Sequence, residues 1–157
     1  MSIPAKHFFT PEEQQEITRA IREAELDTSG EIRVHIEKRC PGTVLDRTAY
    51  LFRQLHMHRT KLRNGVLFYL SVADRKFAII GDSGINKAVP PTFWDEIKEG
   101  MQARFREGKF AEGLSEAILK AGKQLKTHFP HRKDDMNELK DEISFGANCQ
   151  LPWCFLI

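Results

Sequence analysis

Apolar positions recur along this chain with two different periods, which predict helices in some segments and strands in others. In residues 11–26 the apolar side chains lie three or four positions apart, the spacing of one face of a helix. Residues 31–37 alternate strictly between polar and apolar side chains, which indicates a strand that buries Ile32, Val34 and Ile36. Residues 66–73 are almost continuously apolar, as is typical of a central strand covered on both faces.

The boundaries of these elements are marked by capping and turn residues. Thr10-Pro11-Glu12-Glu13 combines a capping box with a proline at the first helical position, and the turn at 27–30 should end this helix near Leu26. The periodic segments 43–55, 93–105 and 110–125 predict three further helices. Asp74-Arg75 is a tight connection between 66–73 and 76–80, so these two segments should form an antiparallel hairpin.

The predicted order is therefore α-β-α-β-β-α-α. Strands 31–37 and 66–73 are joined through a helix and should be parallel and adjacent, with a right-handed crossover. The fold class that follows is α/β, a small mixed β-sheet flanked by helices on both faces.

The domain organisation predicted from this pattern is one domain followed by a tail. Residues 8–130 contain all the predicted elements. Residues 131–157 are first acidic and then apolar, ending in Leu151-Pro-Trp-Cys-Phe-Leu-Ile157, an end that could pack in a groove or remain free.

Composition sets limits on location and partners. The 157 residues are 41% hydrophobic and 29% charged with a formal net charge of +2, so the overall charge indicates neither a nucleic acid nor a membrane as partner. No apolar run approaches the ~20 residues of a transmembrane helix, and the N-terminus lacks the apolar core of a signal peptide. Three sparse cysteines without metal-type spacing suit a reducing compartment, and we expect a cytoplasmic location.

The main candidate site follows the apolar run that ends at Gly81. Asp82, Ser83 and Asn86 come at the exit of a strand, where α/β sheets usually keep their chemistry. Asp82 and Asn86 offer oxygen ligands for Ca²⁺ or Mg²⁺, and Asp74 and Glu31 would join them only if the fold brings them close. The alternative is that Asp82 caps a turn that Asn86 stabilises locally.

Catalytic residues cannot be assigned from the sequence, and no cofactor-binding motif is present. An aspartate-nucleophile phosphatase needs D-x-D, and Asp82-Ser83-Gly84 supplies only the first acid. Cys40 is followed by Arg47 at the wrong spacing for a cysteine phosphatase, and Ser83 has no base beside it in sequence.

A second candidate surface is cationic. No acidic residue occurs between Asp46 and Asp74, and this interval carries several basic side chains, namely Arg47, Arg53, Arg59, Lys61 and Arg63. The functional interpretation is a surface for phosphate groups or an acidic partner, and the alternative is a solvated helix end. The aromatic interleaving typical of single-stranded nucleic-acid binding is absent here.

Several fragments together resemble the TPM domain family. Gly30-Glu31-Ile32-Arg33-Val34 corresponds to its first strand, Gly65-Val66-Leu67 with Asp74-Arg75-Lys76 to its hairpin, and Phe105 to Leu114 to its "F--GK---GL" segment. Residues 81–94 resemble the motif GDxGINxxVPxxFW of a soluble bacterial subgroup, and residues 137–146 resemble the end of that subgroup.

This resemblance implies a TPM-like fold and a range of functions. Plant members work in photosystem II repair, one lineage has an attributed phosphatase activity, and divalent metal binding is reported for some bacterial members. Many members carry GxGLE with a later acid, where this chain has Gly84-Ile85-Asn86 and Pro91. The leading hypothesis is thus a soluble binding or accessory module with a groove beside the 81–86 turn, for a protein partner or a small phosphorylated ligand. The alternative is a weak divalent-metal-dependent phosphatase.

Overall fold

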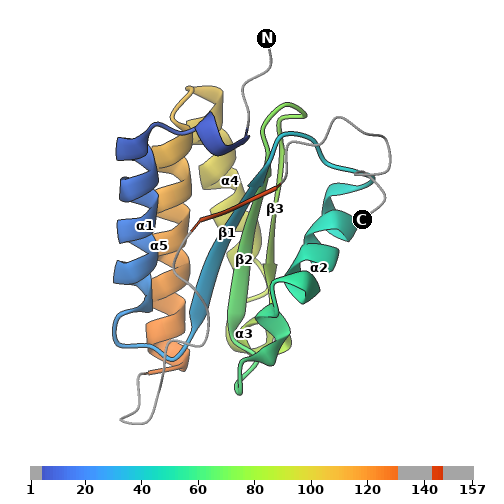
Figure 1. The fold of residues 1–157 in the computed structure, drawn as a ribbon. Helices are drawn as coiled ribbons and strands as arrows, with labels where there is room; N and C mark the ends of the chain where they lie inside the picture. The colour runs from blue at the N-terminus through green and yellow to red at the C-terminus, as the bar shows by residue number, and fades with distance from the viewer. Residues whose placement is uncertain (1–4, 131–142, 147–157) are drawn as a thin grey trace.

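The computed structural model describes residues 5–130 and 143–146, which form a sheet between layers of helices (Figure 1). Two short 3-10 helices, η1 and η2, cover Ala5–His7 and Met57–Arg59. The α-helices are α1 Pro11–Glu25, α2 Val44–Gln54, α3 Ser83–Ala88, α4 Phe93–Arg106 and α5 Phe110–His128. The strands are β1 Glu31–Glu37, β2 Gly65–Ser71, β3 Lys76–Gly81 and β4 Ser144–Phe145.

The strands form one mixed sheet in the order β3-β2-β1-β4. β1 and β2 are parallel with Glu31 opposite Gly65, and β3 runs antiparallel to β2 with Gly81 opposite Val66. The predicted parallel pair and the predicted hairpin are both confirmed.

Helices cover both faces of the sheet, which confirms the predicted fold class (Figure 1). α1, α4 and α5 share a core with Ile32, Val34 and Ile36 of β1 and with the even-numbered residues 66–70 of β2. On the other face α2 contributes Leu51 and Phe52 to a smaller core. The capping box predicted at Thr10 and Glu13 is present, and α1 ends at Glu25 with Leu26 as its C-cap, close to the predicted end.

Besides the two 3-10 helices, one α-helix and one strand were not predicted. α3 lies where the sequence indicated only a turn, and β4 lies in the segment interpreted as a tail. β4 pairs in parallel with β1, so residues beyond 130 complete the sheet. Neither element has enough residues to show a period, because six residues make under two helical turns and two residues cannot show an alternation. The apolar end 151–157 lies outside the described residues.

The polar face of β1 is also buried, which strict alternation did not predict. Glu31, His35 and Glu37 are each at most 5% exposed, and Arg33 on the same face is half-buried. Because these side chains are buried, their polar atoms must find partners inside the fold. Within the described residues no helix is long and apolar enough to cross a membrane.

Candidate functional site

The sheet has two ends, and the candidate residues are divided between them. β1 and β2 both start at one end of the sheet, at Glu31 and Gly65, and we call this end the amino edge. Both strands finish at the opposite end, at Glu37 and Ser71, and we call that end the carboxyl edge. Because β3 is antiparallel to both, its exit at Gly81 lies at the amino edge. Asp82, Ser83, Asn86 and the buried Glu31 are therefore at one end of the sheet. Asp74 follows β2, at the opposite end, so the fold does not bring it to Asp82.

Asp82 is buried at the start of α3 and paired with Arg63. Arg63 donates from Nε to Oδ2 at 2.7 Å and from Nη2 to Oδ1 at 3.0 Å, while the Ser83 backbone N–H donates to Oδ1 at 2.7 Å. The hydrogen bond and the charge of Asp82 raise the pKa of Arg63 above its ordinary value. Both carboxylate oxygens thus have partners in the folded chain, in a helix-capping arrangement.

Asn86 is held by an equally local network. Its Nδ2 donates to the Gly81 carbonyl at 2.7 Å, and Trp94 Nε1 donates to its Oδ1 at 2.8 Å. Ser83 is exposed. Asp74, at the far edge, accepts from Ser71 Oγ at 2.9 Å and from the Cys40 N–H at 2.6 Å.

These contacts bear on the Ca²⁺ or Mg²⁺ expectation. The oxygens of Asp82 and Asn86 already accept hydrogen bonds from Arg63 and Trp94, and a cation would also have to displace the Arg63 guanidinium charge. Within the described ranges no three His, Cys, Asp or Glu side chains are grouped to hold a metal ion. A divalent cation at Asp82 would therefore have to replace the bonds from Arg63, and the Ca²⁺ or Mg²⁺ site stays a prediction.

The structure joins the 81–86 turn to the cationic segment 53–63. The N–H of Gly84 donates to the Arg63 carbonyl at 2.8 Å. A Cβ at Gly84 would lie only 2.0 Å from the Leu62 carbonyl oxygen, so this approach requires glycine. We call residues 53–63 and 81–87 together the amino-edge surface. Its exposed basic side chains include four of the five that the sequence singled out, Arg53, Arg59, Lys61 and Arg63, and also Lys87. The fifth, Arg47, lies in α2 and pairs with Glu37 instead.

A second polar assembly, at the carboxyl edge, was not predicted. Glu37 accepts from Tyr69 Oη at 2.5 Å and from Arg47 Nε at 3.0 Å, and its Oε1 lies 3.5 Å from His35 Nε2. His35 Nδ1 lies 2.7 Å from Ser144 Oγ on β4. We call these five residues the carboxyl-edge cluster. The sequence signal was present, since a buried tyrosine in a central strand needs a polar partner and alternation places His35 and Glu37 on one face.

The cluster shifts the pKa values of its members strongly. Burial alone would raise the pKa of Glu37, but hydrogen bonds from His35, Arg47 and Tyr69 and the charge of Arg47 outweigh it, and the pKa falls from 4.5 to about 2. Burial and the bonded Glu37 carboxylate raise the pKa of Tyr69 far above its ordinary value. Glu37 is therefore an anion at neutral pH, balanced by Arg47.

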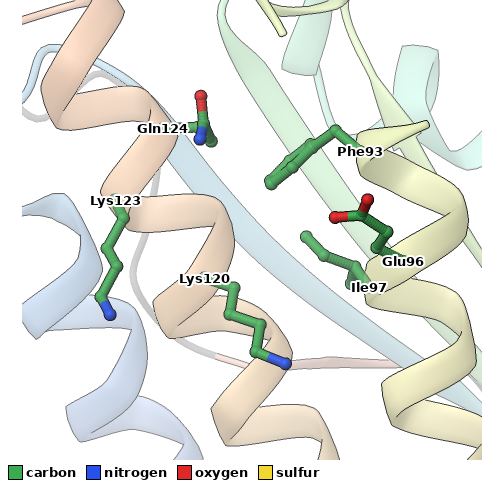
Figure 2. A pocket seen from close by; sticks show the side chains of 6 residues that line it. All are labelled: Phe93, Glu96, Ile97, Lys120, Lys123 and Gln124. Atoms are coloured by element: carbon green, nitrogen blue, oxygen red, sulfur yellow. The ribbon is translucent and has the colours of Figure 1, made fainter. Parts of the chain in front are cut away.

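A shallow hollow of about 270 Å³ lies elsewhere, between α4 and α5 (Figure 2). Phe93 and Ile97 form its apolar part, and Glu96 of α4 with Lys120, Lys123 and Gln124 of α5 completes its lining. This hollow is not the groove predicted beside the 81–86 turn, because none of its lining residues belongs to that turn.

Comparison with known proteins identifies the family. The family model of the TPM domain matches residues 3–124. The chain belongs to the TPM domain family. The matched range thus covers every described element except β4 and the C-terminal end of α5.

Solved structures agree with this assignment. The NMR structure of the BA42 protein from the psychrophilic bacterium Bizionia argentinensis is 48% identical, with a TM-score of 0.84 over 93% of this chain and 100% of that one. The N-terminal domain of a P. gingivalis protein matches at 24% identity and TM-score 0.67, covering 80% of this chain and 83% of that one. A similar domain from Corynebacterium glutamicum matches at 13% and 0.61, covering 75% and 74%. These last two share the fold. No curated protein matches the chain.

Proposed function

We propose that this TPM domain is a binding or accessory module that takes an acidic protein partner on its amino-edge surface. The observation that carries the proposal is the close approach of Gly84 to the Leu62–Arg63 backbone. This contact joins the strand-end turn and the basic segment, which are separate in sequence, into one surface on a rigid frame.

The charge of this surface favours an acidic partner. Within residues 53–63 and 81–87 the one acidic side chain is Asp82, and it is buried against Arg63. The remaining charged side chains are basic and exposed, and Leu62 adds an apolar side chain that is 42% exposed. Exposed cations around an apolar residue suit an acidic polypeptide, whose contact should weaken as salt screens the charges.

The alternative function, a weak divalent-metal-dependent phosphatase, has less support. It requires Asp82 to leave Arg63 before it can hold a cation. If this alternative holds, Asp82→Asn should abolish metal-dependent hydrolysis of a generic phosphate ester while the fold persists. Turnover that is absent in the parent protein, or unchanged in the variant, would exclude Asp82 as a catalytic metal ligand.

Residue-resolved NMR titration tests the binding proposal. A glutamate-rich peptide serves as the probe, with Ca²⁺, Mg²⁺ and phosphoserine titrated separately. We expect the peptide to shift the amide signals of residues 53–63 and 81–87, and the shifts to fade toward 1 M salt, where the Debye length falls to about 3 Å.

A matched pair of variants distinguishes binding at this surface from a nonspecific effect of net charge. Arg59→Glu with Lys61→Glu should weaken peptide binding about tenfold or more, whereas the same charge change at the exposed Arg19 and Arg22 of α1 should leave it nearly unchanged. Equal losses in both variants, or peptide shifts mapped to another surface, would overturn the proposal.

A further inference from the structure

β3 is the outer strand of the sheet, with β2 as its one strand neighbour among the described residues (Figure 1). The Asp82 N–H donates to the Gly65 carbonyl at 2.9 Å, which sets the phase of the ladder between the two strands. Backbone groups of successive residues point to opposite sides of a strand, so the even-numbered residues of β3 bond to β2. The N–H and C=O groups of Phe77 and Ile79 therefore point to the other side, which we call the free edge.

One end of the free edge is closed by side chains. The Gly81 carbonyl points to this edge and accepts from Asn86 Nδ2 at 2.7 Å, and a Cβ at Gly81 would lie 2.7 Å from Trp94 Cζ2. Within the described chain, no such partner reaches the outward backbone groups of Phe77 and Ile79. Their side chains are half-buried against the core beneath α4 and α5. The open part of the edge thus combines unpaired backbone groups with apolar side chains, a template for pairing with another chain.

The charges at the two ends of β3 are basic. Arg75 and Lys76 are exposed at its start, and neither forms an ion pair with a residue that the structure describes. At its other end β3 leads directly into the amino-edge surface. A second copy of this chain fits this edge poorly, because antiparallel pairing of two β3 strands would bring Arg75 and Lys76 of one copy beside the basic amino-edge surface of the other. The charges instead complement a strand with acidic ends.

We propose that the free edge of β3 binds an extended segment of the acidic partner as an added strand. Backbone hydrogen bonds to Phe77 and Ile79 hold this segment, apolar side chains of the segment pack beside theirs, and acidic residues at its ends meet the two basic groups. The inference deepens the proposed function and rests on it for the acidic chemistry of the partner.

Residue-resolved hydrogen exchange tests the added strand. The probe is a peptide with glutamates at both ends and alternating valine and threonine between them. In the free protein, the amides of Phe77 and Ile79 should exchange at least about tenfold faster than that of Ala78, which bonds to β2. Saturating peptide should slow the exchange of Phe77 and Ile79 by about tenfold or more and change Ala78 less. Slow exchange of both residues already in the free protein, or no slowing with the peptide, would overturn the proposal.

A matched pair of variants at one position tests the backbone contact itself. Ile79→Pro removes an N–H that points to the free edge and leaves the ladder to β2 in place, whereas Ile79→Val keeps that N–H. Peptide affinity should fall by about tenfold or more in Ile79→Pro and change by less than about twofold in Ile79→Val. Protection of the Ala78 amide in both variants reports that β3 is intact. Equal affinities in the two variants would refute strand addition.

The same titration distinguishes this inference from the proposed function. Peptide-induced shifts in residues 53–63 and 81–87 without slower exchange at Phe77 and Ile79 would overturn the added strand and leave the amino-edge surface as the binding site. Slower exchange at Phe77 and Ile79 without shifts in residues 53–63 would support the added strand and overturn the amino-edge proposal. A peptide with lysines in place of the glutamates should bind at least about tenfold more weakly, and equal binding would contradict the acidic chemistry of the partner.

Discussion

At the scale of single residues, the buried carboxylate of Glu37 carries the clearest stability prediction. It accepts from Tyr69 and Arg47, and its removal would leave a guanidinium with 13% side-chain exposure without its partner. A buried ion pair adds little net stability over apolar packing, but breaking one by removing a single partner is costly.

Glu37→Gln should therefore lower the free energy of unfolding by about 3 kcal/mol, measured by urea denaturation at pH 7. The matched control is Glu116→Gln, which removes the carboxylate that Arg104 binds at 3.2 Å on the exposed side of α4 and α5. This surface pair should contribute less than about 1 kcal/mol. Similar losses in the two variants would contradict the assigned role of the carboxyl-edge cluster.

The same carboxylate predicts a pH dependence of stability. The pKa of Glu37 is about 2 in the folded chain against 4.5 ordinarily, so the folded state binds this proton less tightly than the unfolded state does. The stabilisation is present above pH 4.5 and should be lost as pH falls from 4.5 toward 2, by about 3 kcal/mol in total. Urea denaturation of the parent and of Glu37→Gln across this range should show their difference shrinking, and a constant difference would refute the shift.

At the scale of elements, the position of α3 depends on a glycine. Gly84→Ala would place its Cβ 2.0 Å from the Leu62 carbonyl oxygen and 2.6 Å from that of Arg63, and these backbone atoms cannot rotate away. We expect the free energy of unfolding to fall by about 3 kcal/mol, because overpacking against the backbone forces α3 to move.

Gly100→Ala in α4 is the control for this change. The nearest atom to its added Cβ is Lys120 Nζ at 3.6 Å, the end of a flexible side chain. Alanine is a better helix former than glycine, so the free energy of unfolding of this variant should rise by up to about 1 kcal/mol. Thermal unfolding of both variants measures the contrast, and a Gly84→Ala protein as stable as the parent would show that α3 adjusts at no cost.

At the scale of the whole molecule, the domain boundary can be tested by truncation under reducing conditions. Ending the chain after Pro130 removes β4, the Ser144 partner of His35 and the half-buried Phe145. It should lower stability by about 2–4 kcal/mol and expose the β1 edge to association. Ending it after Gly146 should keep most of the stability. Equal Tm values for the two truncations would mean that β4 is not part of the cooperative unit.

The sequence by itself determined the secondary-structure order, the parallel pair, the hairpin and the helical layers on both faces. These depend on local signals, such as the capping box at Thr10 and the alternation in 31–37, that hold whatever the rest of the chain does. It also identified the basic side chains of segment 53–63 and the position of Asp82 at a strand exit.

Only the tertiary structure decided which of these residues meet. The close approach of Gly84 to the Leu62–Arg63 backbone joins the 81–86 turn to segment 53–63, two segments that no sequence pattern connects. The Glu37 pairing with Arg47 and Tyr69, and the pairing of β4 with β1, likewise join residues far apart along the chain. Such contacts depend on how elements pack, and no local pattern of apolar and polar positions encodes that arrangement.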